Sequence, residues 1–261
     1  MIPTRLLLDW QPHAPWPTED QVEQDLILTR LLVTLFADEE AASMLAFRGG
    51  TALHKLVFAE PGRYSEDLDL VQRQPGPIKP VLEVVQPMIE ALLGKANVEL
   101  RRDGVRLTWR YDAEASGTRR RIKVEINTRE HESFDAIVAV PVSCETRWFS
   151  GRAHVISYTP AELLATKMRA LYQRKKGRDL FDLGLALATL PVDGAAIAER
   201  FRWYLARQGL AVSAAEYQAN LGRKVADRNF GADVGPLLRA GIEFDADHAA
   251  ELVADRLIAH L

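Results

Sequence analysis

The chain has 261 residues, 48% of them hydrophobic, and a net charge of −3. The hydrophobic content is enough for a packed core, and the length allows one large domain or two modest ones. The charge argues against attraction of nucleic acid to the whole surface, so any such attraction has to come from local clusters.

The same composition argues against a membrane protein and a disulfide-rich protein. No run of about eighteen apolar residues exists, and the three leucines at 6–8 end at Asp9, too soon for the core of a signal peptide. We therefore expect a cytoplasmic protein with no membrane contact. Cys144 is the only cysteine, which excludes an internal disulfide and a cysteine-based zinc site. Its place in the apolar run 137–144 predicts a buried thiol.

The first predicted element is an amphipathic helix. Thr18 follows a proline-rich start and suits a helix N-cap, and apolar residues recur at helical spacing over residues 26–36. We expect this helix to pack on a sheet. The next predicted elements are a strand at 44–47, a short helix at about 51–58 and a second strand that carries two acidic residues.

The second strand presents a pair of aspartates on one face. Residues two apart on a strand share a face, so Asp67 and Asp69 converge while Leu68 and Leu70 face the core. Two carboxylates held close together repel unless a cation lies between them, and hard oxygen ligands select Mg²⁺ or Mn²⁺. The pair predicts a divalent metal site, although alone it also suits a solvated strand edge.

A glycine turn precedes the aspartate pair. Gly49 and Gly50 remove the side chains that would block close backbone approach, and Thr51 can begin a helix whose N-terminal amides bind phosphate. Alone, such a turn is commonly only the start of a helix. Together with the aspartates it is typical of a nucleotidyltransferase active site, where a nucleoside triphosphate and its metal meet.

A helix and a hairpin follow. Residues 81–93 have their apolar side chains on one helical face, and residues 98–111 alternate around Asp103-Gly104, a dipeptide favoured in tight hairpin turns. Basic residues outnumber acidic ones over residues 101–129. Such a cluster suits a polyanion, and a solvated strand face is the alternative.

A further strand at 119–127 carries one acid among bases. Glu125 shares a face with Arg121 and Lys123. If this strand lies beside the aspartate strand, Glu125 is a third carboxylate that binds metal and helps to deprotonate an attacking hydroxyl. The alternative is an ion pair of Glu125 with Lys123 or Arg121.

From about residue 158 the pattern becomes helical, so we predict two domains, residues 1–157 and 158–261. Thr159 suits a helix N-cap, and Glu162 three residues later can reach back to it. Lys167 lies on this helix and begins a second basic stretch.

Another helix begins near Gly177 and places Asp179 and Asp182 one turn apart on one face. Three later helical stretches carry no comparable chemistry and are interpreted as scaffold or partner surface. They are residues 193–207, 213–220 and 246–260.

Three sequence blocks carry a resemblance to a known family. The blocks are FRGGTALHK at 47–55 with RYSEDLD at 63–69, KVEIN at 123–127, and ELLATK at 162–167 with Arg174 and RDLFDL at 178–183. In order and spacing they resemble the AbiEii family of nucleotidyltransferase toxins, which includes the mycobacterial MenT enzymes. The resemblance covers about residues 47–183 and leaves out the C-terminal third.

The resemblance implies an α/β fold of the polymerase-beta nucleotidyltransferase type, a mixed sheet with flanking helices, joined to a C-terminal helical domain that closes over the nucleotide. It implies a metal-dependent toxin that transfers a nucleotide from an NTP, most readily to the 3′ end of tRNA, and so blocks translation and growth. By position, Asp67 and Asp69 match the metal-binding pair. Lys167 matches the lysine that contacts the triphosphate, and Asp179 the acid of the Arg-Asp block.

The chemistry of the residues extends this set. Lys167 would neutralise the departing pyrophosphate with help from Arg174 or Arg178, and Asp179 would hold Lys167 or Arg178 by a charge-assisted hydrogen bond. The alternative is that these cations are solvated on a helix surface and that Arg178-Asp179 only caps a helix.

Other functions stay open at this point. The acceptor could be a protein hydroxyl or a small molecule, and a third reading is a module that binds a nucleotide or a partner without turnover. A kinase-like phosphotransferase is disfavoured, because the sequence has no His-x-Asp-x-x-x-x-Asn arrangement. The resemblance implies a cognate antitoxin as partner, and we expect a monomer.

Overall fold

The computed structural model describes residues 2–261 and divides them into two compact units. Unit 1 comprises the chain up to Ala52, together with Tyr64–Ser133 and Ile137–Tyr158. Unit 2 comprises Leu53–Arg63, Phe134–Ala136 and Thr159–Leu261. Two short segments therefore group with the helical residues after 158, and the predicted division into 1–157 and 158–261 stays a prediction.

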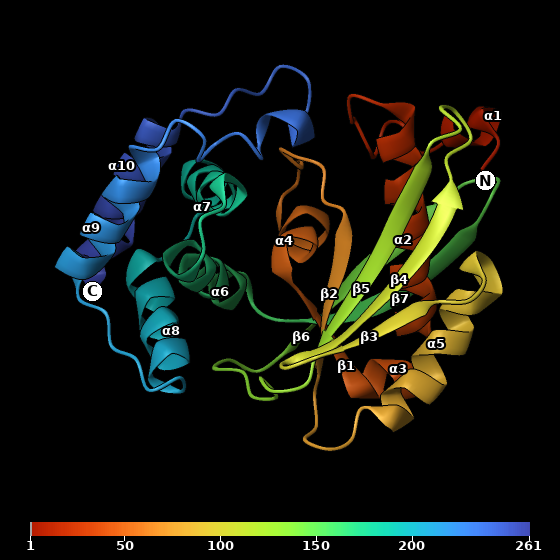
Figure 1. Ribbon diagram of the computed structural model, residues 1–261, viewed down its shortest axis with the longest axis horizontal. Helices are drawn as coiled ribbons and strands as arrows, with labels where there is room; N and C mark the ends of the chain where they lie inside the picture. The colour runs from red at the N-terminus through yellow and green to blue at the C-terminus, as the bar shows by residue number, and fades with distance from the viewer. Residues whose placement is uncertain (1) are drawn as a thin grey trace. The chain divides into compact units, whose positions relative to one another are not determined.

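Unit 1 is built on a seven-stranded mixed sheet, which confirms the predicted fold class (Figure 1). The strand order is β3-β4-β5-β2-β1-β7-β6, with β2 parallel to β5 and antiparallel to β1. The strands are β1 (Leu45–Arg48), β2 (Asp67–Gln72), β3 (Asn97–Arg101), β4 (Gly104–Asp112), β5 (Arg119–Asn127), β6 (Val138–Glu145) and β7 (Ser150–Ser157).

The described residues of unit 1 form five helices, and the longest, α2, packs against β7 and β6. Its N-cap is Thr18, as predicted, in a capping box with Gln21 that satisfies two backbone donors. The helices are α1 (Thr4–Leu7), α2 (Glu19–Ala37), α3 (Glu39–Met44), α4 (Gly49–Ala52) and α5 (Lys79–Leu93).

The two faces of the sheet differ in chemistry. On β5, Ile122, Val124 and Ile126 are at most 1% exposed and belong to the core. The residues that alternate with them, such as Lys123 and Glu125, are half-buried. This period-two pattern makes one face hydrophobic and leaves the charged side chains on the other. Cys144 is buried, as predicted.

Unit 2 is helical, with α6 packed on α8 and α7 packed on α10. Among residues 2–261, no helix is both long enough and apolar enough to span a membrane. The elements are η1 (Leu53–Val57), α6 (Pro160–Gln173), α7 (Gly177–Thr189), α8 (Gly194–Ala206), α9 (Ala214–Val225), η2 (Gly235–Leu237), α10 (Ala246–Arg256) and η3 (Ile258–His260).

The predicted start of α6 is right, but the predicted role of Glu162 is wrong. Thr159 caps the helix by accepting the Glu162 backbone N–H. The Glu162 carboxylate does not reach back to Thr159. It accepts the backbone N–H groups of Phe134 and Asp135, at 2.6 and 3.1 Å, and the Tyr204 hydroxyl at 2.7 Å. Glu162 is buried, and a buried carboxylate depends on hydrogen-bond donors more than the end of a helix depends on a second cap.

Candidate active site

The three predicted carboxylates of unit 1 lie together on the charged face of the sheet. Asp67 and Asp69 alternate on β2 with the buried Leu68, and Asp69 lies directly opposite Glu125 on the parallel strand β5. The condition for a third carboxylate, that the two strands lie side by side, is met. Asp69 and Glu125 are thus like charges in a cross-strand pair, an arrangement that costs stability unless cations lie near them.

Two of the three carboxylates have a cation from a neighbouring strand beside them. The Lys123 ammonium lies 3.0 and 3.1 Å from the two carboxylate oxygens of Asp67. The Arg106 guanidinium on β4 reaches Glu125 Oε1, at 2.8 Å from Nε and 2.6 Å from Nη2. The predicted alternative partners of Glu125 were therefore wrong. Lys123 is directed to Asp67, and Arg121 lies opposite Arg110, four residues along β5 from Glu125.

The donor set suits a divalent metal that is completed by other ligands. Among residues 2–261, no three Asp, Glu, His or Cys side chains are gathered closely enough to hold a metal ion by themselves. Mg²⁺ is commonly held by one or two carboxylates together with water and substrate phosphates. Asp67 and Asp69 offer two carboxylates on one face, and the Lys123 contact shows that both oxygens of Asp67 accept a cation. These residues therefore fit Mg²⁺ or Mn²⁺.

The glycine turn lies directly against Asp69. Gly49 has φ +84°, and a Cβ atom added to it would lie 2.2 Å from Asp69 Oδ2. Only glycine fits at this position, because it accepts the positive φ and leaves room for the carboxylate. Gly50 follows it in α4, so the turn joins β1 to a short helix that contacts β2.

Thr51 has a different role from the predicted one. The helix begins at Gly49, so Thr51 lies inside α4 and is not its N-cap. Its side chain is buried, its hydroxyl donates to the Asp67 carbonyl at 2.5 Å, and it lies 2.7 Å from the Ser65 hydroxyl. Thr51 therefore ties the glycine turn to the start of β2.

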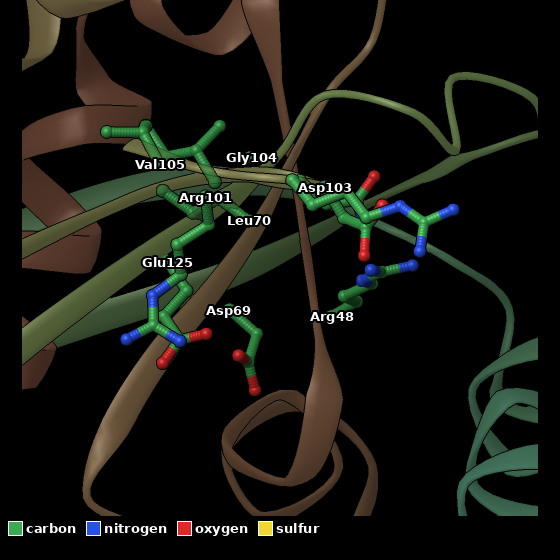
Figure 2. A pocket seen from close by; sticks show the side chains of 11 residues that line it. Arg48, Asp69, Leu70, Arg101, Asp103, Gly104, Val105 and Glu125 are labelled. Atoms are coloured by element: carbon green, nitrogen blue, oxygen red, sulfur yellow. The ribbon is translucent and has the colours of Figure 1, made fainter. Parts of the chain in front are cut away.

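A pocket of about 360 Å³ opens beside two of the carboxylates. Figure 2 shows Asp69 and Glu125 with their carboxylates pointing to the same side, and Arg48 and Asp103 across from them. Burial alone would lower the pKa of Arg48, but its partner Glu130 holds this pKa above the usual value. Arg48 is thus a fixed cation at the rim, and local sequence reasoning missed it.

In unit 2, the predicted lysine is a buried cation. Lys167 on α6 is 6% exposed, and its ammonium lies 3.0 Å from Asp179 Oδ1 and 3.0 Å from Asp182 Oδ2. The predicted contact of Asp179 with Lys167 is confirmed, and the alternative of a solvated surface lysine is wrong. Arg174 also binds Asp179, at 2.7 and 2.9 Å. Arg178 is directed instead to Asp233, at 3.8 Å.

Asp182 is the hub of this buried cluster, and its partners were not predicted. The Arg63 guanidinium binds both Asp182 oxygens at 2.7 Å, and His54 Nε2 lies 2.9 Å from Oδ1. Arg63 and His54 precede Asp182 by 119 and 128 residues. Both lie within the FRGGTALHK and RYSEDLD blocks, but no local pattern shows where their side chains point.

The cluster sets the protonation of its members. Burial alone would raise the pKa of Asp182, but Arg63 and Lys167 hold it well below the usual value. Burial likewise opposes the lowered pKa of Asp179, and Lys167 and Arg174 outweigh it. Burial lowers the pKa of His54 to about 4, because the attraction of Asp182 does not offset it and two neighbouring cations add to it. At neutral pH three cations therefore face two carboxylates.

The sequence profile described as nucleotidyl transferase AbiEii toxin of a type IV toxin–antitoxin system matches residues 30–255. This match extends past residues 47–183 into the C-terminal third, which the motif resemblance had left out. No curated protein is similar enough in sequence to count as a relative.

The fold is similar to that of solved structures, two of which follow. MenT4, a nucleotidyltransferase toxin from Mycobacterium tuberculosis H37Rv, is 17% identical and superimposes with a TM-score of 0.69 over 100% of this chain and 91% of its own. JHP933 from Helicobacter pylori is 18% identical, with a TM-score of 0.62 over 93% of each chain. At these identities the likeness concerns the fold alone.

The close approach of Gly49 to Asp69 predicts a large effect of Gly49→Ala on stability. An alanine at positive φ costs about 1–2 kcal/mol, and here its Cβ also collides with the Asp69 carboxylate. Gly117→Ala is a matched control, because Gly117 has φ +64° and open space around it. We expect urea denaturation to show a decrease in stability for Gly49→Ala that exceeds the control by roughly 1–3 kcal/mol. Equal decreases would contradict the collision.

The lowered pKa of His54 predicts acid sensitivity. Between pH 6.5 and 4 the unfolded chain binds a proton at His54 that the folded chain does not, so the free energy of unfolding falls as the pH drops. The decrease is at most about 1.4 kcal/mol per pH unit. The free energy of unfolding, measured by urea denaturation at pH 7, 6 and 5, should fall less steeply with decreasing pH in His54→Gln than in the wild type. His248→Gln, whose side chain is 66% exposed, should keep the wild-type slope. Parallel slopes for all three proteins would exclude this assignment.

Proposed function

Because the chain belongs to the AbiEii family and is a nucleotidyltransferase toxin of a type IV toxin–antitoxin system, we propose that it transfers a nucleotide from an NTP to the 3′ end of tRNA. A tRNA modified in this way cannot be charged, so translation and growth stop. The observation that carries the proposal is the grouping of Asp67, Asp69 and Glu125 on one sheet face, directly beside the Gly49 turn.

The carboxylates have distinct roles in this proposal. Asp67 and Asp69 hold Mg²⁺ or Mn²⁺, which supplies charge neutralisation to the transferring phosphoryl group and to the departing pyrophosphate. Glu125 accepts the proton of the acceptor hydroxyl, whose oxygen forms the new bond to phosphorus as pyrophosphate leaves. Arg106 keeps the Glu125 carboxylate in one orientation. Gly49 and Gly50 give the phosphates close access to the backbone, and Thr51 ties this turn to the start of β2 through the Asp67 carbonyl.

The buried cluster of unit 2 supports a role in phosphate binding. Lys167 keeps the position of the lysine that contacts the triphosphate in the family resemblance, and Asp179 fixes it. With three cations against two carboxylates, the cluster has one positive charge in excess, which favours an anion. Arg174 has a half-exposed side chain and is the member most able to reach a ligand. We assign Arg178 only an assisting role, since Asp233 is its nearest carboxylate.

A nucleic-acid acceptor is favoured by the basic hollow, a cavity of about 580 Å³ on the charged face of the sheet. Successive cations on β5 are two residues apart, about 6.6 Å along the strand. A row of this kind suits a phosphate backbone better than a small molecule. The hollow has one acid in its lining, Glu99, and its cations are Lys95, Arg106, Arg110, Arg119, Arg121 and Lys123.

Membership of a type IV toxin–antitoxin family implies an antitoxin partner. We propose that a cognate antitoxin encoded nearby neutralises the enzyme, and that both act in the cytoplasm, where tRNA is found. A protein hydroxyl or a small molecule as acceptor is the competing outcome of the transfer assay.

The catalytic assignment is tested with each of the four labelled NTPs, purified tRNA and cell lysate, with and without Mg²⁺. We expect label in tRNA only when the metal is present, and activity reduced at least about a hundredfold in Asp67→Asn and Asp69→Asn. Glu83→Gln is the control, because it removes an acid from α5, where the side chain of Glu83 is 64% exposed and pairs with Lys79 away from the site. Label in protein or small molecules would replace tRNA as the acceptor. Full activity of both aspartate variants would reject the metal site.

The acceptor surface is tested by charge reversal. Arg110 and Arg121 are exposed and lie opposite each other on β4 and β5. In the Arg110→Glu, Arg121→Glu double variant we expect weaker tRNA binding and a salt dependence whose slope falls by about 0.7–0.9 for each phosphate that the protein no longer neutralises. The Lys79→Glu, Arg152→Glu double variant makes the same change in net charge at side chains that are 82% and 87% exposed, and it is the control. Equal weakening in both proteins would argue against the basic hollow as the acceptor surface.

A further inference from the structure

Two acids on the charged face of the sheet are held by different kinds of cation. Arg106 applies two nitrogens of its rigid guanidinium to one oxygen of Glu125. Lys123 applies a single ammonium to both oxygens of Asp67. A lysine is a point charge on a flexible four-carbon stem, whereas an arginine fork is pre-organised. Asp67 therefore has the more easily released partner.

The position of Lys123 conflicts with metal binding at Asp67. The ammonium occupies the side of the carboxylate where both oxygens are offered to one cation. The side chains of Lys123 and Asp67 are each 25% exposed, so water screens the pair and its contribution is modest. A divalent cation with a higher charge can displace such a partner.

A second place for the lysine exists on the same face. Lys123 lies on β5 between Glu125 and Arg121 and lines the basic hollow. Once it leaves Asp67, its ammonium adds one unpaired charge to the cations of this hollow. Binding of metal and binding of a polyanion then favour each other. By linkage, each ligand raises the affinity of the protein for the other ligand by the same factor.

We propose that Lys123 is an exchangeable counter-ion of Asp67, which it holds until a divalent cation binds and then leaves for the acceptor phosphates in the basic hollow. The inference rests on the proposed function for the identity of the acceptor. Lys123 is thus a positioning residue that couples metal loading to acceptor binding.

The first test measures Mn²⁺ binding to the full chain without nucleotide, from the electron paramagnetic resonance signal of free Mn²⁺ in 0.15 M KCl. Lys123→Met keeps the unbranched stem and removes the ammonium, so we expect about two- to fivefold tighter binding. Arg121→Met removes the same charge from the same strand face, one pleat away from Asp67. The Arg121 side chain is exposed and acts on Asp67 only through water, so the control should stay within about 1.5-fold of the wild type.

The second test follows the fluorescence anisotropy of a labelled short single-stranded RNA with and without Mg²⁺ at constant ionic strength. We expect Mg²⁺ to tighten RNA binding to the wild type about two- to fivefold and to have no such effect on Lys123→Met. Arg121→Met should bind RNA more weakly in both conditions but keep the gain from Mg²⁺.

Three outcomes would overturn the inference. They are equal Mn²⁺ affinities of Lys123→Met and Arg121→Met, no Mn²⁺ binding by the wild type, and a gain from Mg²⁺ that persists in Lys123→Met. None of these readouts uses nucleotide transfer. If transfer fails while the Mn²⁺ and RNA shifts appear, the exchange stands and the proposed reaction falls. If transfer succeeds while the shifts are absent, only the exchange is rejected.

Discussion

The parallel pairing of β2 with β5 fixes the charge pattern on which the candidate site depends. These strands are distant in sequence, and their register sets Asp69 against Glu125 and Asp67 against Lys123. A shift by one residue would turn every one of these side chains into the core, because strand side chains alternate. The buried residues Leu68 and Val124, which are register partners on the core face, therefore hold the acids in place as firmly as any polar contact does.

The same principle of compensated charge appears in unit 2 in a buried form. Removing a carboxylate from water is costly, and the attraction of a partner repays it only when the geometry is good and the remaining lone pairs are satisfied. Asp182 meets this condition with contacts from Arg63, His54 and Lys167. The neutral state of His54 belongs to the same balance, since burial disfavours its charged form and two neighbouring cations add to this effect. His54 Nδ1 has no hydrogen-bond partner among residues 2–261, so one buried polar atom of the cluster is left unsatisfied.

Local features of the fold could be predicted from the sequence, and distant pairings could not. The cap at Thr18, the β3–β4 hairpin and the alternation along β5 depend on neighbouring residues, so their patterns are visible in the chain. The turn of this hairpin is Arg102-Asp103, one residue earlier than predicted, because Gly104 already pairs with Arg101 in β4. The grouping of Asp67 and Asp69 follows from the same period of two. By contrast, Arg106 reaches Glu125 only because of the β4–β5 register, and Arg63 reaches Asp182 across 119 residues. Thr51 was misassigned for a related reason. Its hydroxyl serves a strand carbonyl that only the folded chain brings close.

Two lysines show how burial decides what a cation can do. Lys123 contacts one carboxylate and is 25% exposed, so water can solvate its ammonium when it moves. Lys167 contacts two carboxylates and is 6% exposed. If it moved away, these buried carboxylates would lose a partner. Lys167 can therefore act on an anion only through a fixed field, which Arg63 and Arg174 reinforce. A fixed field needs no rearrangement when a phosphate arrives, which suits stabilisation of a departing group. A mobile ammonium suits exchange between ligands, and the two residues cannot trade these roles.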